Sequence, residues 1–247
     1  FLRACGRSGV DAREIDVEEA RAREPALSPE TMATVEVRDG YLDPFFLTQG
    51  NVRDAREHGA RVINYAHVKD MSVSGGRVDR VDYQDLRTGT VESIVPEVVV
   101  NATGAWADRI AGMAGLNIPM RVDKGSLVVM NGRLTRGLIN RLRPPSDGDI
   151  VVPSHSSSIV GTTSVAIDDP DDCRPTREEV DRLIGEGACM LPALGEARAV
   201  RAYAGIRPLP AESESGREIS RAYHLLDHEE EGVDNLVSII GGKLTTY

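Results

Sequence analysis

The sequence contains no apolar run approaching the roughly 20 residues needed to cross a bilayer, and its start lacks the basic-then-apolar pattern of a signal peptide. Both absences predict a water-soluble protein. The 247 residues, 40% apolar and 28% charged, suffice for one large domain or two modest ones. Because the chain starts at Phe1 without a methionine and stops just after a strand and a glycine pair, we expect an internal fragment of a longer protein.

Cysteine is scarce, and its three copies at Cys5, Cys173 and Cys189 form no Cys-x-x-Cys pair and have no histidine pair nearby. This pattern supports neither a disulfide framework nor a zinc site, and it indicates a reducing compartment. The chain also lacks the Gly-x-Ser-x-Gly elbow of serine hydrolases. We therefore expect no metal and no hydrolase triad.

Positive charge is sparse and dispersed. The net charge of −10 argues against a nucleic-acid surface, which needs clustered basic residues. Only three of the 29 basic residues are lysines, and two of them, Lys124 and Lys243, each adjoin a glycine. A compact lysine in a glycine turn suits a small anionic ligand, although both residues could also be ordinary surface lysines.

The hydrophobic pattern predicts a mixed α/β chain. Asp16 and Thr176 are expected to cap helices, and a third helix should run from Pro44 through His58. Strands are expected at residues 61–64, 77–83, 90–94, 97–102, 125–130, 149–153, 158–163 and 236–240. The first three strands would form an antiparallel meander, and those after residue 121 a second antiparallel sheet.

Two apolar strands run into glycine turns. Residues 97–102 lack polar alternation, as expected of a strand covered on both faces, and lead into Thr103, Gly104 and a helix through Ala114. Residues 236–240 lead into a second glycine turn and a helix start. Glycine lets the backbone approach a ligand, and unpaired N–H groups of a starting helix favour anions. The pattern predicts a cofactor site where the two strands end.

The basic residues after position 200 include Arg207, between a glycine-containing turn and Pro208, and Arg221. A fixed guanidinium can bind phosphate or carboxylate through two hydrogen bonds, but a surface arginine is the alternative reading. The histidines give no clear site: His228 lies in an acidic stretch that predicts a surface strand end, with no obvious partner.

Eight stretches together resemble the FAD-dependent glycerol-3-phosphate dehydrogenases, within the D-amino-acid-oxidase-like flavoproteins, and are most similar to the catalytic A subunit of the anaerobic enzyme. They occur in family order at residues 39–44 (DGYLDP), 57–60 (EHGA), 98–104 (VVVNATG), 124–126 (KGS), 160–163 (VGTT), 204–209 (AGIRPL), 216–221 (GREISR) and 241–247 (GGKLTTY). Any one stretch is weak evidence, whereas their order across nearly the whole chain is specific.

The resemblance implies a partial, Rossmann-like FAD-binding domain with a β-meander, at residues 51–115 and 236–247, and a substrate-binding domain with an antiparallel sheet, at residues 1–50 and 116–235. The residues that would approach FAD are Val68, Thr103, Gly104, Gly241, Gly242, Lys243, Leu244 and Thr245. Those that would bind the substrate phosphate are Arg207, Arg221 and Lys243.

The implied reaction is hydride transfer from C2 of sn-glycerol 3-phosphate to FAD, giving dihydroxyacetone phosphate, with the electrons passing to a quinone. Further dehydrogenase subunits with iron–sulfur centres and a membrane anchor are the implied partners. The implied location is the cytoplasm, with peripheral attachment to the cytoplasmic face of the cell membrane left open.

The chain departs from the family pattern in two respects. The N-terminal Gly-x-Gly-x-x-Gly unit is absent, so this piece is expected to hold FAD poorly and to be inactive alone. Aerobic relatives have a histidine after Lys-Gly-Ser, where this chain has Leu127, and this leaves the general base unassigned. Two rival functions stay open: an FAD-dependent oxidoreductase of amino acids or 2-hydroxy acids, and a non-catalytic flavoprotein subunit or inactive fragment.

Overall fold

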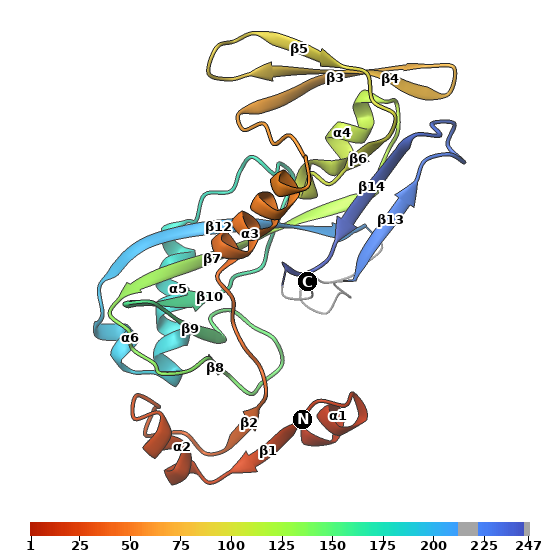
Figure 1. The fold of residues 1–247 in the computed structure, drawn as a ribbon. Coiled ribbons are helices and arrows are strands. Elements are labelled where there is room, and N and C mark those ends of the chain that lie inside the picture. Colours follow the sequence, from red (N-terminus) through yellow and green to blue (C-terminus); the bar gives the residue numbers. More distant parts are fainter. Residues whose placement is uncertain (212–221, 245–247) are drawn as a thin grey trace. The chain divides into compact units, whose positions relative to one another are not determined.

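The computed structural model describes residues 1–211 and 222–244 and has the predicted mixed α/β composition (Figure 1). The chain divides into two compact units. The first unit consists of Phe1–Tyr41, Lys124–Ala166 and Asp171–Ile206; the second consists of Leu42–Asp123, Ile167–Pro170 and the residues from Arg207 onward.

The helices that the structure describes are α1 (Leu2–Arg7), α2 (Val17–Arg23), α3 (Pro44–Glu57), the 3-10 turn η1 (Gly104–Trp106), α4 (Ala107–Met113), α5 (Arg177–Met190) and α6 (Ala193–Glu196). The strands are β1 (Ala12–Ile15), β2 (Thr34–Val37), β3 (Ala66–Ser74), β4 (Arg77–Asp85), β5 (Val91–Ile94), β6 (Val99–Asn101), β7 (Met120–Asn131), β8 (Ile139–Asn140), β9 (Ile150–Ser154), β10 (Ser157–Gly161), β11 (Val165–Ile167), β12 (Ala199–Pro210), β13 (Tyr223–Asp227) and β14 (Leu236–Gly241).

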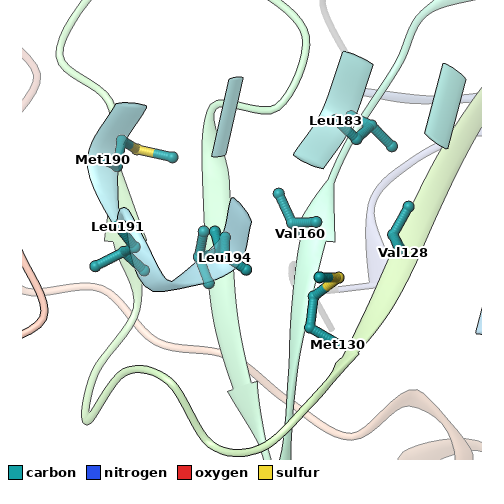
Figure 2. Packing of buried hydrophobic residues seen from close by; sticks show 8 residues of the cluster. Val128, Met130, Val160, Leu183, Met190, Leu191 and Leu194 are labelled. Carbon is teal, nitrogen blue, oxygen red and sulfur yellow. The ribbon is translucent and has the colours of Figure 1, made fainter. Parts of the chain in front are cut away.

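The core of the first unit lies between α5, α6 and a sheet with the strand order β11-β7-β10-β9-β8, in which β12 also pairs with β7. Strand β10 runs antiparallel to both β7 and β9, which confirms the predicted antiparallel sheet. Figure 2 shows Leu183 of α5 and Leu194 of α6 among the sheet valines Val128 and Val160. Each fully buried leucine contributes about 1.5–3 kcal/mol.

The predicted helix caps are confirmed. The Asp16 carboxylate accepts a hydrogen bond from the Glu18 amide at the start of α2. Thr176 and Glu179 form a reciprocal capping box at the start of α5, which satisfies amide groups that have no partner within a helix. Helix α3 starts at Pro44, as expected from the preference of proline for a first helical turn.

The second unit contains an antiparallel meander, in which β4 pairs with β3 and β5; β4 and β5 match the predicted strands at residues 77–83 and 90–94. It also contains a sheet in the order β13-β14-β6, with β14 antiparallel to β13 and parallel to β6. Helix α4 packs its fully buried Ala107 and Ala111 against Ile240 of β14. The small alanine side chains let the helix lie close to the strand.

Two strand predictions are wrong. Residues 61–64 form no strand; β3 begins instead at Ala66, after Tyr65 adopts a φ of 60°, which interrupts an extended backbone. The segment predicted as a strand covered on both faces is not so covered, since Val98, just before β6, and Val100 within it are 60% and 65% exposed. Among the described residues, α4 packs against β6 and no layer covers the exposed valines.

The second unit holds the described residues that we assigned to FAD, but its boundaries differ from those of the predicted domain. In particular, Arg207 belongs to this unit rather than grouping with the first one. The assignment of cofactor and substrate roles to the units stays a prediction.

Candidate functional site

The predicted cofactor site lies where β6 and β14 end side by side in the second unit (Figure 1). These strands are parallel neighbours, with Ser238 opposite Asn101, so both reach the same edge of the sheet. Gly104 follows β6, Gly241 is the last residue of β14 and Gly242 comes after it; their φ values are 61°, 78° and 82°. Residues other than glycine rarely adopt such φ values, so glycine is strongly favoured in both turns.

The surroundings of the glycines differ between the two turns. A Cβ atom added at Gly104 would meet nothing within 4 Å, so the backbone there is open to an approaching ligand. A Cβ atom at Gly241 would lie 2.7 Å from the carbonyl oxygen of Ala222. Gly104 is therefore suited to close ligand approach, and Gly241 to close packing of β14 beside β13.

Thr103 is exposed next to the first turn, but its hydroxyl group donates a 2.6 Å hydrogen bond to Oδ1 of the buried Asn101. The hydroxyl proton is therefore committed to the protein. An anion bound at Thr103 would find its donors in the backbone, which is the usual arrangement where glycine turns bind phosphate.

The other predicted cofactor residues are placed as follows. Lys243 and Leu244 are exposed directly after the second turn. Val68 of β3 packs against the core cluster that contains Met71 and Val78, so its side chain is part of the hydrophobic packing of the second unit. Thr245 and the substrate residue Arg221 lie outside the described residues.

Arg207 is held by a buried carboxylate. The structure places it within strand β12, where the sequence predicted a position beside a turn. Its Nη1 atom donates a 2.5 Å hydrogen bond to Oδ1 of Asp123 on β7. The Asp123 side chain is 3% exposed and that of Arg207 is 21% exposed. Asp123 therefore orients the guanidinium while part of it stays accessible to solvent.

Lys124 is neither a surface lysine nor part of an open anion site, because it is buried in the first unit. Its Nζ atom lies 3.1 Å from Oε2 of Glu179 and donates to the carbonyl oxygen of Arg174. Oε1 of Glu179 accepts hydrogen bonds from the hydroxyl groups of Ser126 and Thr163. The Lys-Gly-Ser and Gly-Thr-Thr segments are thus joined to the start of α5.

These contacts change the acidity of Glu179. Burial alone would raise its pKa, but hydrogen bonds from Thr176, Lys124 and Ser126 outweigh that effect and hold the pKa below its ordinary value of 4.5. A carboxyl group with a lowered pKa contributes stability that is fully present above its unfolded-state pKa and is lost as the pH falls through the folded-state pKa.

We expect Glu179→Gln to make the unfolding free energy less dependent on pH below about pH 5, where the wild-type carboxyl group takes up its proton. The variant should be less stable than the wild type at neutral pH, and the difference should shrink on acidification. Urea unfolding at a series of pH values measures this, with Glu178→Gln, exposed on the same helix turn, as the control. A difference that stayed constant with pH would contradict the role of the Glu179 charge.

His228 was wrongly predicted to lie at the surface. It is 1% exposed, its Nδ1 atom is hydrogen bonded to Glu231, and its Nε2 atom lies 2.9 Å from Oγ of Ser238. Sequence reasoning also missed Asp123, and it assigned Glu179 only to the capping box of α5, without its contact to Lys124. For Asp123, the available signal was a charged residue inside an apolar strand pattern. For His228, the acidic residues around it in the sequence indicated an exposed position and gave no sign of burial.

Further observations limit the kind of site. A depression of about 820 Å³ along α3 is lined by residues such as Phe46 and Arg53 and includes none of the predicted site residues. Within residues 1–211 and 222–244, no group of three or more His, Cys, Asp or Glu side chains could hold a metal ion. In that same part of the chain, no helix has the length and hydropathy required to cross a membrane.

Comparison with known proteins gives matches over the whole chain. The chain is 45% identical to the A subunit of the anaerobic glycerol-3-phosphate dehydrogenase of Escherichia coli K12 and 39% identical to the A1 subunit of the Haloferax volcanii enzyme of the same name. Both matches cover 100% of this chain, but only 46% and 44% of the relatives. The chain therefore spans about half the length of these curated relatives.

Solved structures agree with the fold. The glycerol-3-phosphate dehydrogenase of Bacillus halodurans, solved with FAD, matches with a TM-score of 0.76 and 25% identity over 94% of this chain and 46% of its own. Glycine oxidase of Bacillus cereus matches with a TM-score of 0.77 over 98% of this chain and 61% of its own, and at 21% identity this likeness shows the fold alone.

The family model described as DAO, FAD dependent oxidoreductase, matches residues 1–247. This match includes both glycine turns at the ends of β6 and β14 and the strand that carries Arg207. The chain belongs to the DAO family of FAD-dependent oxidoreductases.

Proposed function

We propose that the gene product containing this chain oxidises sn-glycerol 3-phosphate to dihydroxyacetone phosphate. The observation that carries this proposal is the 45% identity, over the entire chain, to the A subunit of an anaerobic glycerol-3-phosphate dehydrogenase. The stretches AGIRPL and GGKLTTY, which hold two of the predicted substrate cations, lie within that match.

The residues present fit a dinucleotide cofactor. Two parallel strands reach one sheet edge, each followed by a glycine turn with positive φ, and the space at the Cβ position of Gly104 is open. Ligands of open α/β sheets bind at such edges. Gly104 and Gly241 to Leu244, together with Thr103, Thr245 and the backbone of Val68, would hold FAD, which when bound supplies the acceptor for the substrate hydride.

The substrate phosphate would be bound by Arg207, Lys243 and Arg221. Asp123 fixes the Arg207 guanidinium through Nη1, so the side chain is oriented before a ligand arrives. Orientation in advance reduces the entropy lost on binding. Several cations around one dianion would also favour a phosphate over neutral glycerol. Lys243 is one candidate for accepting the proton of the C2 hydroxyl group, and a purely electrostatic role is the other.

The electron acceptor and partners extend the same proposal. The word "subunit" in the names of the relatives supports an assembly with further subunits. We propose that a quinone receives the electrons through partners with iron–sulfur centres and a membrane anchor, at the cytoplasmic face of the membrane.

The test uses the full gene product purified with FAD. Adding sn-glycerol 3-phosphate without oxygen should bleach the flavin absorbance rapidly, whereas glycerol and D-alanine should leave it unchanged. Bleaching by an amino acid or 2-hydroxy acid instead would favour the rival oxidoreductase. Flavin that stayed oxidised with all of these compounds would favour a non-catalytic role.

A further inference from the structure

A chain of hydrogen bonds, buried at its centre, crosses the second unit from the end of β13 to the sheet edge where β6 and β14 end. It begins at Glu231, passes through His228 and Ser238 of β14, and reaches Asn101 of β6 and then Thr103. His228, Ser238 and Asn101 are each at most 2% exposed. None of these contacts is needed to explain substrate binding, and the chain ends beside Gly104.

The direction of the hydrogen bonds made by Asn101 follows from one carbonyl group. The Nδ2 atom of Asn101 lies 2.9 Å from the carbonyl oxygen of Ala107, which can only accept, so the amide nitrogen must face it. Oδ1 of Asn101 therefore faces Thr103 and accepts from its hydroxyl group. The second N–H of the Asn101 amide donates to Oγ of Ser238, 3.2 Å away.

Ser238 joins Asn101 to His228. Oγ of Ser238 accepts from Asn101, and its O–H group lies 2.9 Å from Nε2 of His228, where it can donate. The Nδ1 atom of His228 is hydrogen bonded to Glu231. With the imidazole proton on Nδ1, every polar side-chain atom of this chain has a partner.

We propose that His228 is a positioning residue for the cofactor edge of this sheet. Ser238 and Asn101 stand opposite each other in the parallel register of β14 and β6, so the link between them holds the two strand ends together. The same chain keeps the Thr103 hydroxyl group turned toward Asn101. The backbone at Gly104 and at Gly241 is thereby fixed for FAD, and this inference rests on the proposed cofactor site.

The energetics support a positioning role over simple space filling. Burying polar side chains is unfavourable unless each is hydrogen bonded, and no described buried side-chain nitrogen or oxygen atom lacks a partner. A fully connected polar network specifies one arrangement, whereas apolar side chains of similar volume tolerate sliding of the strands.

The experiment compares His228→Phe and His228→Gln in the full gene product. The first variant fills the space without polar atoms, and the second keeps an oxygen able to accept from Ser238. His224→Gln is the control, because His224 is exposed on β13. Two quantities are measured: the dissociation constant of FAD, from flavin fluorescence, and amide hydrogen exchange in peptides covering residues 101–107, 238–243 and helix α5.

We expect His228→Phe to weaken FAD binding by roughly tenfold, the effect of losing one buried hydrogen bond, and to speed exchange in both turn peptides but not in α5. His228→Gln should restore part of the affinity, and His224→Gln should match the wild type. Unchanged FAD affinity in His228→Phe would overturn the proposal, as would faster exchange spread equally over α5. A wild type that binds FAD but is not reduced by glycerol 3-phosphate would refute only the proposed substrate.

Discussion

Replacing Arg207 by leucine is expected to lower the second-order rate constant for flavin reduction by glycerol 3-phosphate by about a hundredfold to a thousandfold. The variant loses a phosphate ligand and also leaves the buried Asp123 carboxylate without this guanidinium. A buried carboxylate that has lost this cation would repel the substrate phosphate. Anaerobic stopped-flow measurement of flavin absorbance over a range of substrate concentrations gives this rate constant.

Two further variants separate loss of binding from loss of folding. Arg207→Leu combined with Asp123→Asn removes the buried negative charge together with the cation, so it should fold and retain FAD while staying inactive. Asp123→Asn alone keeps the cation but loses its orientation, and should raise the KM for glycerol 3-phosphate more than it lowers kcat. Flavin reduction at the wild-type rate in Arg207→Leu would remove Arg207 from the substrate site.

Lys124→Met is expected to destabilise the protein by about 3–5 kcal/mol, because it leaves the buried Glu179 carboxylate without its cation. That is a large share of the total stability of an ordinary domain. Denaturant unfolding at pH 7 measures the difference. The same substitution at Lys69, which is exposed on β3, is the matched control and should change stability by less than about 0.5 kcal/mol.

A double variant tests whether the charge is the cause. Lys124→Met combined with Glu179→Gln removes both charges, and it should be more stable than Lys124→Met alone, since no isolated carboxylate stays buried. If Lys124→Met behaved like the Lys69 control, the buried pair would have no structural importance.

The elements predicted with most success have local causes. The capping box of α5 and the proline start of α3 are decided by side chains within a single helical turn. Residues 61–64 show the opposite case, because Val62 and Ile63 favour a strand but the backbone at Tyr65 turns away. Local β-preference alone could not decide whether residues 61–64 form a strand or an irregular segment.

The site was predictable only in part, because some of its features depend on local backbone geometry and others on contacts between residues far apart in sequence. Glycine turns can be read from the sequence, because positive φ restricts the choice of residue. The partner of Arg207 lies 84 positions away and that of Lys124 lies 55 positions away, so only the fold brings these charges together. His228 has a partner close in sequence, Glu231, but its contact with Ser238 of β14, ten positions away, also requires the fold.

The exposed valines of β6 affect how this chain behaves in solution. Val98 and Val100 lie on or beside a short strand that, in the described part of the chain, has one partner, β14. An open strand edge bearing apolar side chains is a template on which another extended chain can add, as in aggregation and domain swapping. If residues 1–247 were prepared on their own, this strand would thus be a point at which copies adhere to one another, and colloidal stability would depend on keeping it covered.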